Sequence, residues 1–159
     1  MAITFKLAEF IDIDPLIELV QEFYMFEHMN FDRGVIDAVL GLLSDETFGR
    51  IWLIYDEESE TQKHLAGYVA LIFTYSLETH GRNAMVDELF LRSPHRGKGI
   101  GKEVFRFLED FCQSMNMPVM HLLVDHRNAI AHKFYIKKGF KQQDRYILSK
   151  WLNKRKIEN

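Results

Sequence analysis

The 159-residue sequence has little of several features that mark particular classes of protein. Its single cysteine, Cys112, excludes an internal disulfide and a zinc site built from thiolates. Lysine and arginine number 20 against 23 aspartate and glutamate residues, so the basic excess typical of nucleic-acid-binding proteins is missing. No run of about 18 apolar residues occurs, and the N-terminal residues lack the pattern of a signal peptide. These absences predict a cytoplasmic protein with neither a membrane nor a nucleic acid as partner.

Large apolar side chains, in contrast, are plentiful. The sequence has 13 Phe, 6 Tyr and 2 Trp residues and is 47% hydrophobic. A chain of this length can bury roughly 70% of the surface that it exposes when unfolded. We therefore expect a single folded domain over residues 1–159.

Alternating apolar residues predict strands, and apolar residues at helical spacing predict helices. The predicted strands are residues 3–7, 51–55, 65–75, 84–91, 119–124 and 140–148. The predicted helices are residues 14–29, residues 32–43, a helix that begins at Ile100 and ends before Pro118, and residues 128–138. Asp14 and Asp32 are the predicted caps of the first two helices. Polar residues 56–63 and 78–82 predict turns.

The predicted order of elements is β-α-α-β-β-β-α-β-α-β. Consecutive strands can pair as antiparallel hairpins, whereas the strand, helix and strand over residues 84–124 require a parallel crossover. The sequence thus predicts an α+β fold with a mixed, mostly antiparallel sheet and helices on both faces.

A glycine-rich segment, His95-Arg96-Gly97-Lys98-Gly99-Ile100-Gly101, lies where a predicted strand ends and a helix begins. Glycines let a ligand approach the backbone, and the first amides of a helix point outward at the positive end of its dipole. Such a segment is typical of a phosphate or pyrophosphate site. It matches neither the dinucleotide fingerprint, which needs glycine where Lys102 stands, nor the P-loop, which needs serine or threonine where Glu103 stands.

Two motifs resemble the GNAT superfamily of acyl-CoA-dependent N-acetyltransferases. Arg96, Gly99 and Gly101 match the family signature [Q/R]-x-x-G-x-[G/A]. Residues 128–140 are similar to the family's N-x-x-A-x-x-x-Y-x-x-x-G-F helix, with Asn128 and Tyr135 at the polar positions. Because both motifs occur in order with a strand between them, the resemblance is specific.

The resemblance implies that acetyl-CoA is the acetyl donor, and the spacing of the histidines predicts that no metal takes part. Its pantetheine arm would lie along the central strand, in a wedge between the strand that ends at Leu91 and the one that ends at Val124. Main-chain donors of the glycine segment would hold its phosphates. The cofactor-binding residues that follow are Leu89, Phe90, Leu91, Arg96, Gly97, Lys98, Gly99, Ile100, Gly101, Lys102, Asn128 and Tyr135.

Acetyl transfer to an amine needs a base, because deprotonating an alkylamine at pH 7 costs about 4.6 kcal/mol. Asp87 and Glu88 on the central strand are the candidates, and strand alternation sends their side chains to opposite faces unless a bulge intervenes. We favour Glu88, acting through water, with Asp87 as the substitute. The phenol of Tyr135 can protonate the leaving thiolate, and a main-chain amide near Leu89 or Phe90 would stabilise the oxyanion.

Acidic residues on or near the first helix, together with those of the central strand, could line a cleft for a small amine. The candidate acceptor-binding residues are Glu22, Tyr24, His28 and Glu78. Two alternatives stay open: a protein lysine or N-terminus as acceptor, and a non-catalytic acyl-CoA sensor. The histidines show no metal-ligand spacing. Residues 146–151 could pack across the twofold axis of a homodimer, but nothing in the sequence decides the oligomeric state.

Overall fold

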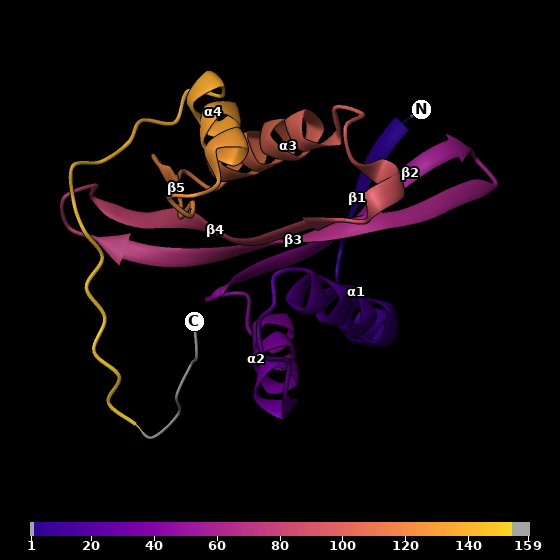
Figure 1. Ribbon diagram of the computed structural model, residues 1–159, viewed down its shortest axis with the longest axis horizontal. Coiled ribbons are helices and arrows are strands. Elements are labelled where there is room, and N and C mark those ends of the chain that lie inside the picture. The colour runs from indigo at the N-terminus through magenta and orange to yellow at the C-terminus, as the bar shows by residue number, and fades with distance from the viewer. Residues whose placement is uncertain (1, 154–159) are drawn as a thin grey trace. The chain divides into compact units, whose positions relative to one another are not determined.

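A five-stranded sheet organises the first part of the chain in the computed structural model, which describes residues 2–153 (Figure 1). Its strands lie side by side in chain order: β1 (Ala2–Leu7), β2 (Gly49–Ser59), β3 (Gln62–Ser76), β4 (Gly81–Leu91) and β5 (Met120–Leu122). The first four strands pair antiparallel, and β5 runs parallel to β4. The predicted mixed, mostly antiparallel sheet and its parallel crossover are therefore confirmed.

Helices cover both faces of this sheet (Figure 1). The helices α1 (Ile13–Phe26) and α2 (Arg33–Ser44) pack on one face, where Leu16, Leu19 and Leu53 are fully buried. On the other face lies α3 (Ile100–Ser114), whose Val104 and Leu108 pack against strand residues such as Ile54. Two apolar layers, one on each side of the sheet, thus hold the strands that carry the site.

The chain comprises two compact units, residues 1–122 and residues 123–159. Within the second unit, α4 (Ala129–Lys137) is capped by Asn128, whose side chain accepts a hydrogen bond from the Ala131 amide over 3.1 Å. Gly139 follows the helix at a φ of 96°, the left-handed conformation that glycine adopts at little cost. The expectation of one domain over the whole chain stays a prediction.

The predicted strand at residues 140–148 is wrong, because the structure shows no strand pairing there. Residues 141–145 are five consecutive polar residues, so an extended chain would have no apolar face to bury. The side chains of residues 141–153 are exposed. The twofold packing of residues 146–151 remains a prediction.

Several element boundaries differ from the prediction for local reasons. The first helix begins at Ile13, because the backbone is already helical in the 3-10 turn Phe10–Asp12, so Asp14 lies in its first turn and is not the cap. It ends at Phe26 and not at residue 29, since His28 adopts a left-handed φ of 55°. The cap assigned to Asp32 is confirmed: its carboxylate accepts from the Val35 amide over 3.2 Å.

The predicted turn over residues 56–63 is instead the end of the β2–β3 hairpin. Glu57 pairs with Lys63 across the two strands, and the Lys63 ammonium lies 2.8 Å from the Glu57 carboxylate. Because of this ion pair, the hydrogen-bonded pairing of β2 with β3 extends through polar residues almost to residue 60. Toward the C-terminus, α3 already ends at Ser114, ahead of Pro118, because Asn116 is left-handed with a φ of 55°.

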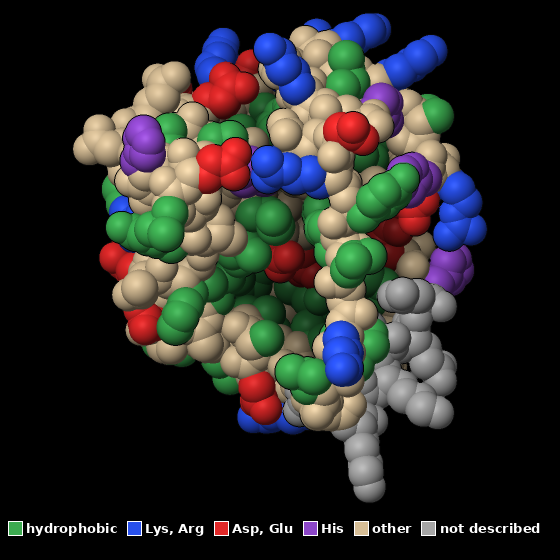
Figure 2. Space-filling model, turned by 90° about the vertical axis from the view of Figure 1, so that its left-hand side faces the viewer, with side chains coloured by type: hydrophobic (Ala, Val, Ile, Leu, Met, Phe, Trp, Pro, Cys, Tyr) green, Lys and Arg blue, Asp and Glu red, His purple; other side chains and the backbone are tan. Residues whose placement is uncertain are grey.

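The surface is of mixed character in the described part of the chain. On the face shown in Figure 2, basic, acidic and apolar side chains are interspersed. No helix within residues 2–153 is both long enough and apolar enough to span a membrane.

Candidate active site

A β-bulge in β4 sets the direction of the site's side chains. Glu88 lies opposite Ala70 of β3 and Val86 lies opposite Leu71, so Asp87 between them has no cross-strand partner. The extra residue reverses the alternation of the strand. Val86 and Leu89 therefore both pack on the α3 side, whereas Glu88 and Phe90 lie on the side of α1.

Two phenols hold the Glu88 carboxylate. Tyr24 of α1 donates to Oε2 over 2.6 Å, and Tyr68 of β3 donates to Oε1 over 3.0 Å. Burial raises the pKa of Glu88 above its usual range, the two phenol hydrogen bonds oppose this change, and the charge of Asp87 adds to it. Burial and the neighbouring carboxylate raise the pKa of both tyrosines, so the phenols stay protonated as donors.

Asp87 differs from Glu88 although the two residues are adjacent. Its pKa is also raised, and burial is the only cause, because no described residue donates a hydrogen bond to its carboxylate. Its side chain still reaches solvent. Its charge raises the pKa of Tyr24, Tyr68 and Glu88, which places it close to that group. The bulge thus brings one held carboxylate and one unpaired carboxylate together.

One edge of β4 becomes free at the bulge. In β4, only residues 84–86 pair with β5, and they lie opposite residues 120–122. The strand predicted to end at residue 124 therefore ends at Leu122. Beyond Val86, no strand of the described chain pairs with β4 on that side. On that side, the backbone donors and acceptors of residues 87–91 are therefore available to an extended ligand, except the Leu91 carbonyl, which accepts from Arg96.

The glycine segment presents further backbone donors. Gly97 and Gly99 have φ angles of 73° and 81°, and a Cβ at either position would meet no atom within 4 Å. Conformation, and not space, is therefore what requires glycine here. In the part of the chain that the structure describes, no acceptor binds the amides of residues 97–101. These amides lie at the N-terminus of the 15-residue α3, where the helix dipole favours an anion.

A contact between His95, the first residue of this segment, and a buried aspartate was not predicted from the sequence. His95 Nδ1 lies 3.0 Å from Oδ2 of Asp56, a residue of β2 that is only 3% exposed. The other carboxylate oxygen of Asp56, Oδ1, is buried without a hydrogen-bond partner among the described residues. The sequence pattern placed Asp56 in a turn, and nothing in its local spacing pointed to a contact 39 residues away.

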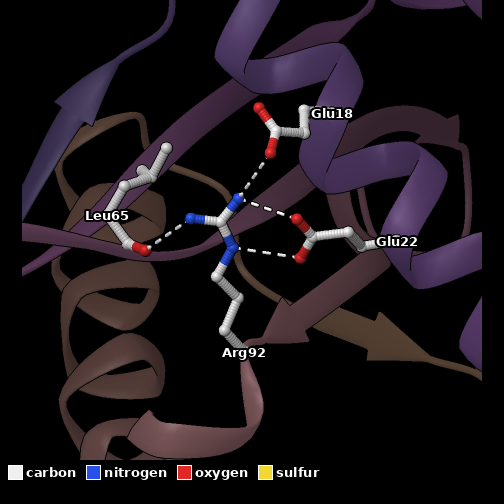
Figure 3. A network of polar contacts seen from close by, with 4 residues as sticks. All are labelled: Glu18, Glu22, Leu65 and Arg92. Atoms are coloured by element: carbon white, nitrogen blue, oxygen red, sulfur yellow. Dashed lines mark hydrogen bonds and ion pairs between the residues drawn. The ribbon is translucent and has the colours of Figure 1, made fainter.

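Arg92, at the end of β4, binds the acids of α1 (Figure 3). Its guanidinium makes two hydrogen bonds to Glu22, of 3.0 and 2.8 Å, and reaches Glu18 at 3.5 Å. It also donates to the backbone carbonyl of Leu65 over 3.3 Å. Glu22, predicted as an acceptor-binding acid, is therefore neutralised by a cation that the sequence reasoning missed.

Arg96, predicted to bind the cofactor, stacks on aromatic rings. Its guanidinium carbon lies 4.4 Å from the ring centre of Phe26 and 5.6 Å from that of Phe90, and its Nε donates to the Leu91 carbonyl over 2.7 Å. Cation–π stacking of this kind fixes a guanidinium while leaving its outer nitrogens available.

The other predicted site residues lie at separate places. Tyr24 is part of the Glu88 group, whereas His28 is exposed in the turn after α1 and Glu78 is exposed in the turn between β3 and β4. In the second unit, Tyr135 packs edge to face against Phe134 and Phe140, and burial raises its pKa. Within residues 2–153, no three histidine, cysteine or acidic residues gather as metal ligands would.

Comparison with known proteins identifies the class. The family model of the acetyltransferase (GNAT) family matches residues 13–140. The chain belongs to this family, whose members transfer acyl groups, so the resemblance found in the sequence is confirmed.

Solved structures share the fold over nearly the whole chain. An integron cassette protein from the mobile metagenome of Cole Harbour Salt Marsh is similar with a TM-score of 0.81 and 26% identity, over 97% of this chain and 93% of that one. A possible acetyltransferase from Clostridium difficile 630 has a TM-score of 0.81 and 18% identity, over 96% and 99%. A predicted acetyltransferase from Clostridium acetobutylicum, solved with acetyl-CoA, has a TM-score of 0.74 and 16% identity, over 94% and 96%.

The phenol contacts lead to a prediction for Tyr24→Phe. This substitution removes a donor to the ionised form of Glu88, so the pKa of that carboxyl should rise further. Carbon-13 NMR titration of glutamate-labelled protein measures this pKa. Tyr75→Phe, at an exposed phenol of β3, is the matched control and should leave it unchanged. An unaltered Glu88 pKa in Tyr24→Phe would contradict the assigned hydrogen bond.

Proposed function

We propose that the protein is an N-acetyltransferase that moves an acetyl group from acetyl-CoA directly to a primary amine. The observation that carries this proposal is the bulge in β4, where two carboxylates lie beside the point at which the strand loses its β5 neighbour. An amine held at Asp87 and Glu88 would sit next to a ligand lying along the free edge at residues 87–91.

The residues present fit acetyl-CoA, which would supply the acetyl group as a thioester. The unpaired amides of residues 97–101 are donors of the kind that bind a pyrophosphate, and the left-handed glycines keep the backbone open to it. Lys98 and Lys102 add positive charge at the exposed surface of the same segment. The free edge of β4 can hydrogen-bond the amide groups of a pantetheine arm.

The unequal environments of the two carboxylates support different roles. Both oxygens of Glu88 accept phenol hydrogen bonds, which favour its ionised form and hold it in place. Asp87 lacks such donors among the described residues and its side chain reaches solvent, so its oxygens are free to take a proton from an amine. We therefore assign Asp87 as the base and Glu88 as the fixed charge that attracts the ammonium group, which reverses the order favoured from the sequence.

The transfer then balances as follows. The ammonium group would lose one proton to Asp87, and the free amine nitrogen would then form a bond to the acetyl carbon. As the carbon–sulfur bond breaks, the sulfur would receive a proton from Tyr135, the second nitrogen proton would return that phenolate to a phenol, and the Asp87 proton would pass to solvent. The raised pKa of Tyr135 keeps this phenol protonated at neutral pH. Cys112 cannot serve as an acyl carrier, because burial raises its pKa to about 11 and leaves it an unreactive thiol. This supports direct transfer without an acyl-cysteine intermediate.

The test of this function measures thiol release from acetyl-CoA with amines, amino acids, aminoglycosides and lysine peptides as acceptors, alongside calorimetric binding of acetyl-CoA. Transfer to a free amine supports the proposal, whereas transfer to peptides alone supports a protein acceptor. Binding without thiol release would support an acyl-CoA sensor. No binding of acetyl-CoA would overturn the proposal.

Substitutions at the bulge separate the two carboxylate roles. Asp87→Asn removes the base and should lower kcat about 100-fold at pH 7, with activity recovering as the pH rises toward the pKa of the amine. In Glu88→Gln the phenols keep a partner but the charge is lost, so the KM of the acceptor should rise with a smaller loss of kcat. Steady-state kinetics against pH measure both, and the reverse pattern would make Glu88 the base.

Tyr135→Phe tests the proton donor. This variant should bind acetyl-CoA as the wild type does while kcat falls by about tenfold or more, since the leaving sulfur loses its acid. Calorimetry and steady-state turnover measure the two effects. Phe134→Tyr, which adds a phenol at the neighbouring position of α4, should not restore turnover in the double variant. Full turnover by Tyr135→Phe would remove this residue from the mechanism.

A further inference from the structure

The charged side chains around the bulge determine which amines fit the site. The acids of α1 that face β4 are already bound by an arginine. Arg92 binds Glu22 through two hydrogen bonds and reaches Glu18 as well, so its one positive charge offsets part of the negative charge of these two acids. Asp87 and Glu88 are then the anionic groups left on β4 beside this helix. Two adjacent carboxylates can attract one ammonium group. The next acid, Asp32, whose charge also raises the pKa of Tyr24, already accepts hydrogen bonds from the Val35 amide and from Asn30.

Aromatic rings surround the Glu88 carboxylate on the α1 side of the sheet. Tyr24 and Tyr68 bind it, and Phe90 is two residues farther along the same face of β4. The rings of Phe90 and Phe26 lie 6.5 Å apart between centres, and Phe26 is 57% exposed at the end of α1. A row of aromatic rings therefore runs from the Glu88 carboxylate to an exposed ring at the end of α1.

A positive charge lies beside this row of rings. The guanidinium of Arg96 stacks on both Phe26 and Phe90. Its Nε is bound to the Leu91 carbonyl, and no acceptor among residues 2–153 binds its outer nitrogens. A second ammonium group on the acceptor would meet this cation, whereas an apolar ring would add to the existing stack.

We propose that the acceptor is a monoamine whose amino group is carried on an apolar or aromatic body, and that Phe26 and Arg96 select against diamines and polyamines. This inference rests on the proposed function and deepens it by naming the substrate class. In this arrangement Asp87 and Glu88 bind the amino group, and the body of the acceptor lies against Phe26 and Phe90.

The experiment compares matched amines with the full-length protein. Tryptamine and 2-phenylethylamine represent the aromatic monoamines, and 1,4-diaminobutane and spermidine represent the polyamines. We expect kcat/KM to favour the aromatic monoamines by about tenfold or more, since loss of an apolar contact alone costs roughly 10-fold to 200-fold in discrimination. Calorimetric binding of 2-phenylethylamine to the protein with CoA present provides a readout that does not depend on turnover.

Phe26→Glu tests the selecting residue directly. It replaces an exposed ring by a carboxylate beside Arg96, so kcat/KM should fall for 2-phenylethylamine and rise for 1,4-diaminobutane, each by about tenfold. Phe48→Glu is the matched control, because it makes the same change at another exposed ring, which is 61% exposed. Phe48 lies toward the other end of β3, where its backbone carbonyl accepts a hydrogen bond from the Phe73 amide. This control should leave both values unchanged.

The outcomes separate this inference from the proposed function. Faster transfer to diamines than to aromatic monoamines in the wild type would overturn the substrate class while the acetyltransferase assignment stands. Equal effects of Phe26→Glu and Phe48→Glu would remove Phe26 as the selecting residue. Acetyl-CoA binding without transfer to any amine would overturn the proposed function, and the inference with it.

Discussion

The extra residue at Asp87 in β4 is the constraint on which the rest of the site depends. Regular alternation from Val86 would turn Glu88 toward α3 and into an apolar layer, where a carboxylate would be costly. The bulge instead places Glu88 on the α1 side, within reach of two phenols, while Leu89 and Leu91 continue the layer beneath α3. Because pairing with β5 stops at Val86, the same point also frees the strand edge.

The first helix is the second determinant of the site, because it contacts the site at three places. Glu18, Glu22 and Phe26 are spaced four residues apart and so lie on one face of α1, where they meet Arg92 and Arg96. From the same helix, Tyr24 reaches the Glu88 carboxylate. A single helix thus orients the carboxylate of the strand and the arginine that begins the glycine motif.

Elements whose signal is local were predictable. Strand alternation, the cap at Asp32 and the glycine segment before α3 depend on neighbours a few residues away, and the structure confirms each. Predictions failed where distant residues compete. The hairpin of β2 and β3 runs through a polar stretch because Glu57 pairs with Lys63, and the last predicted strand is missing where five polar residues leave no face to bury.

The sequence by itself determined the class of fold and the position of the glycine segment and of the two carboxylates, since periodicity and glycine spacing express short-range geometry. Only the tertiary structure decided what each charge does. Glu22 is bound to Arg92 across 70 positions of the chain, and Glu88 to Tyr24 across 64. No local spacing encodes such contacts, because they arise when the two apolar layers bring α1 against β4. They leave Asp87 as the unpaired carboxylate of the site.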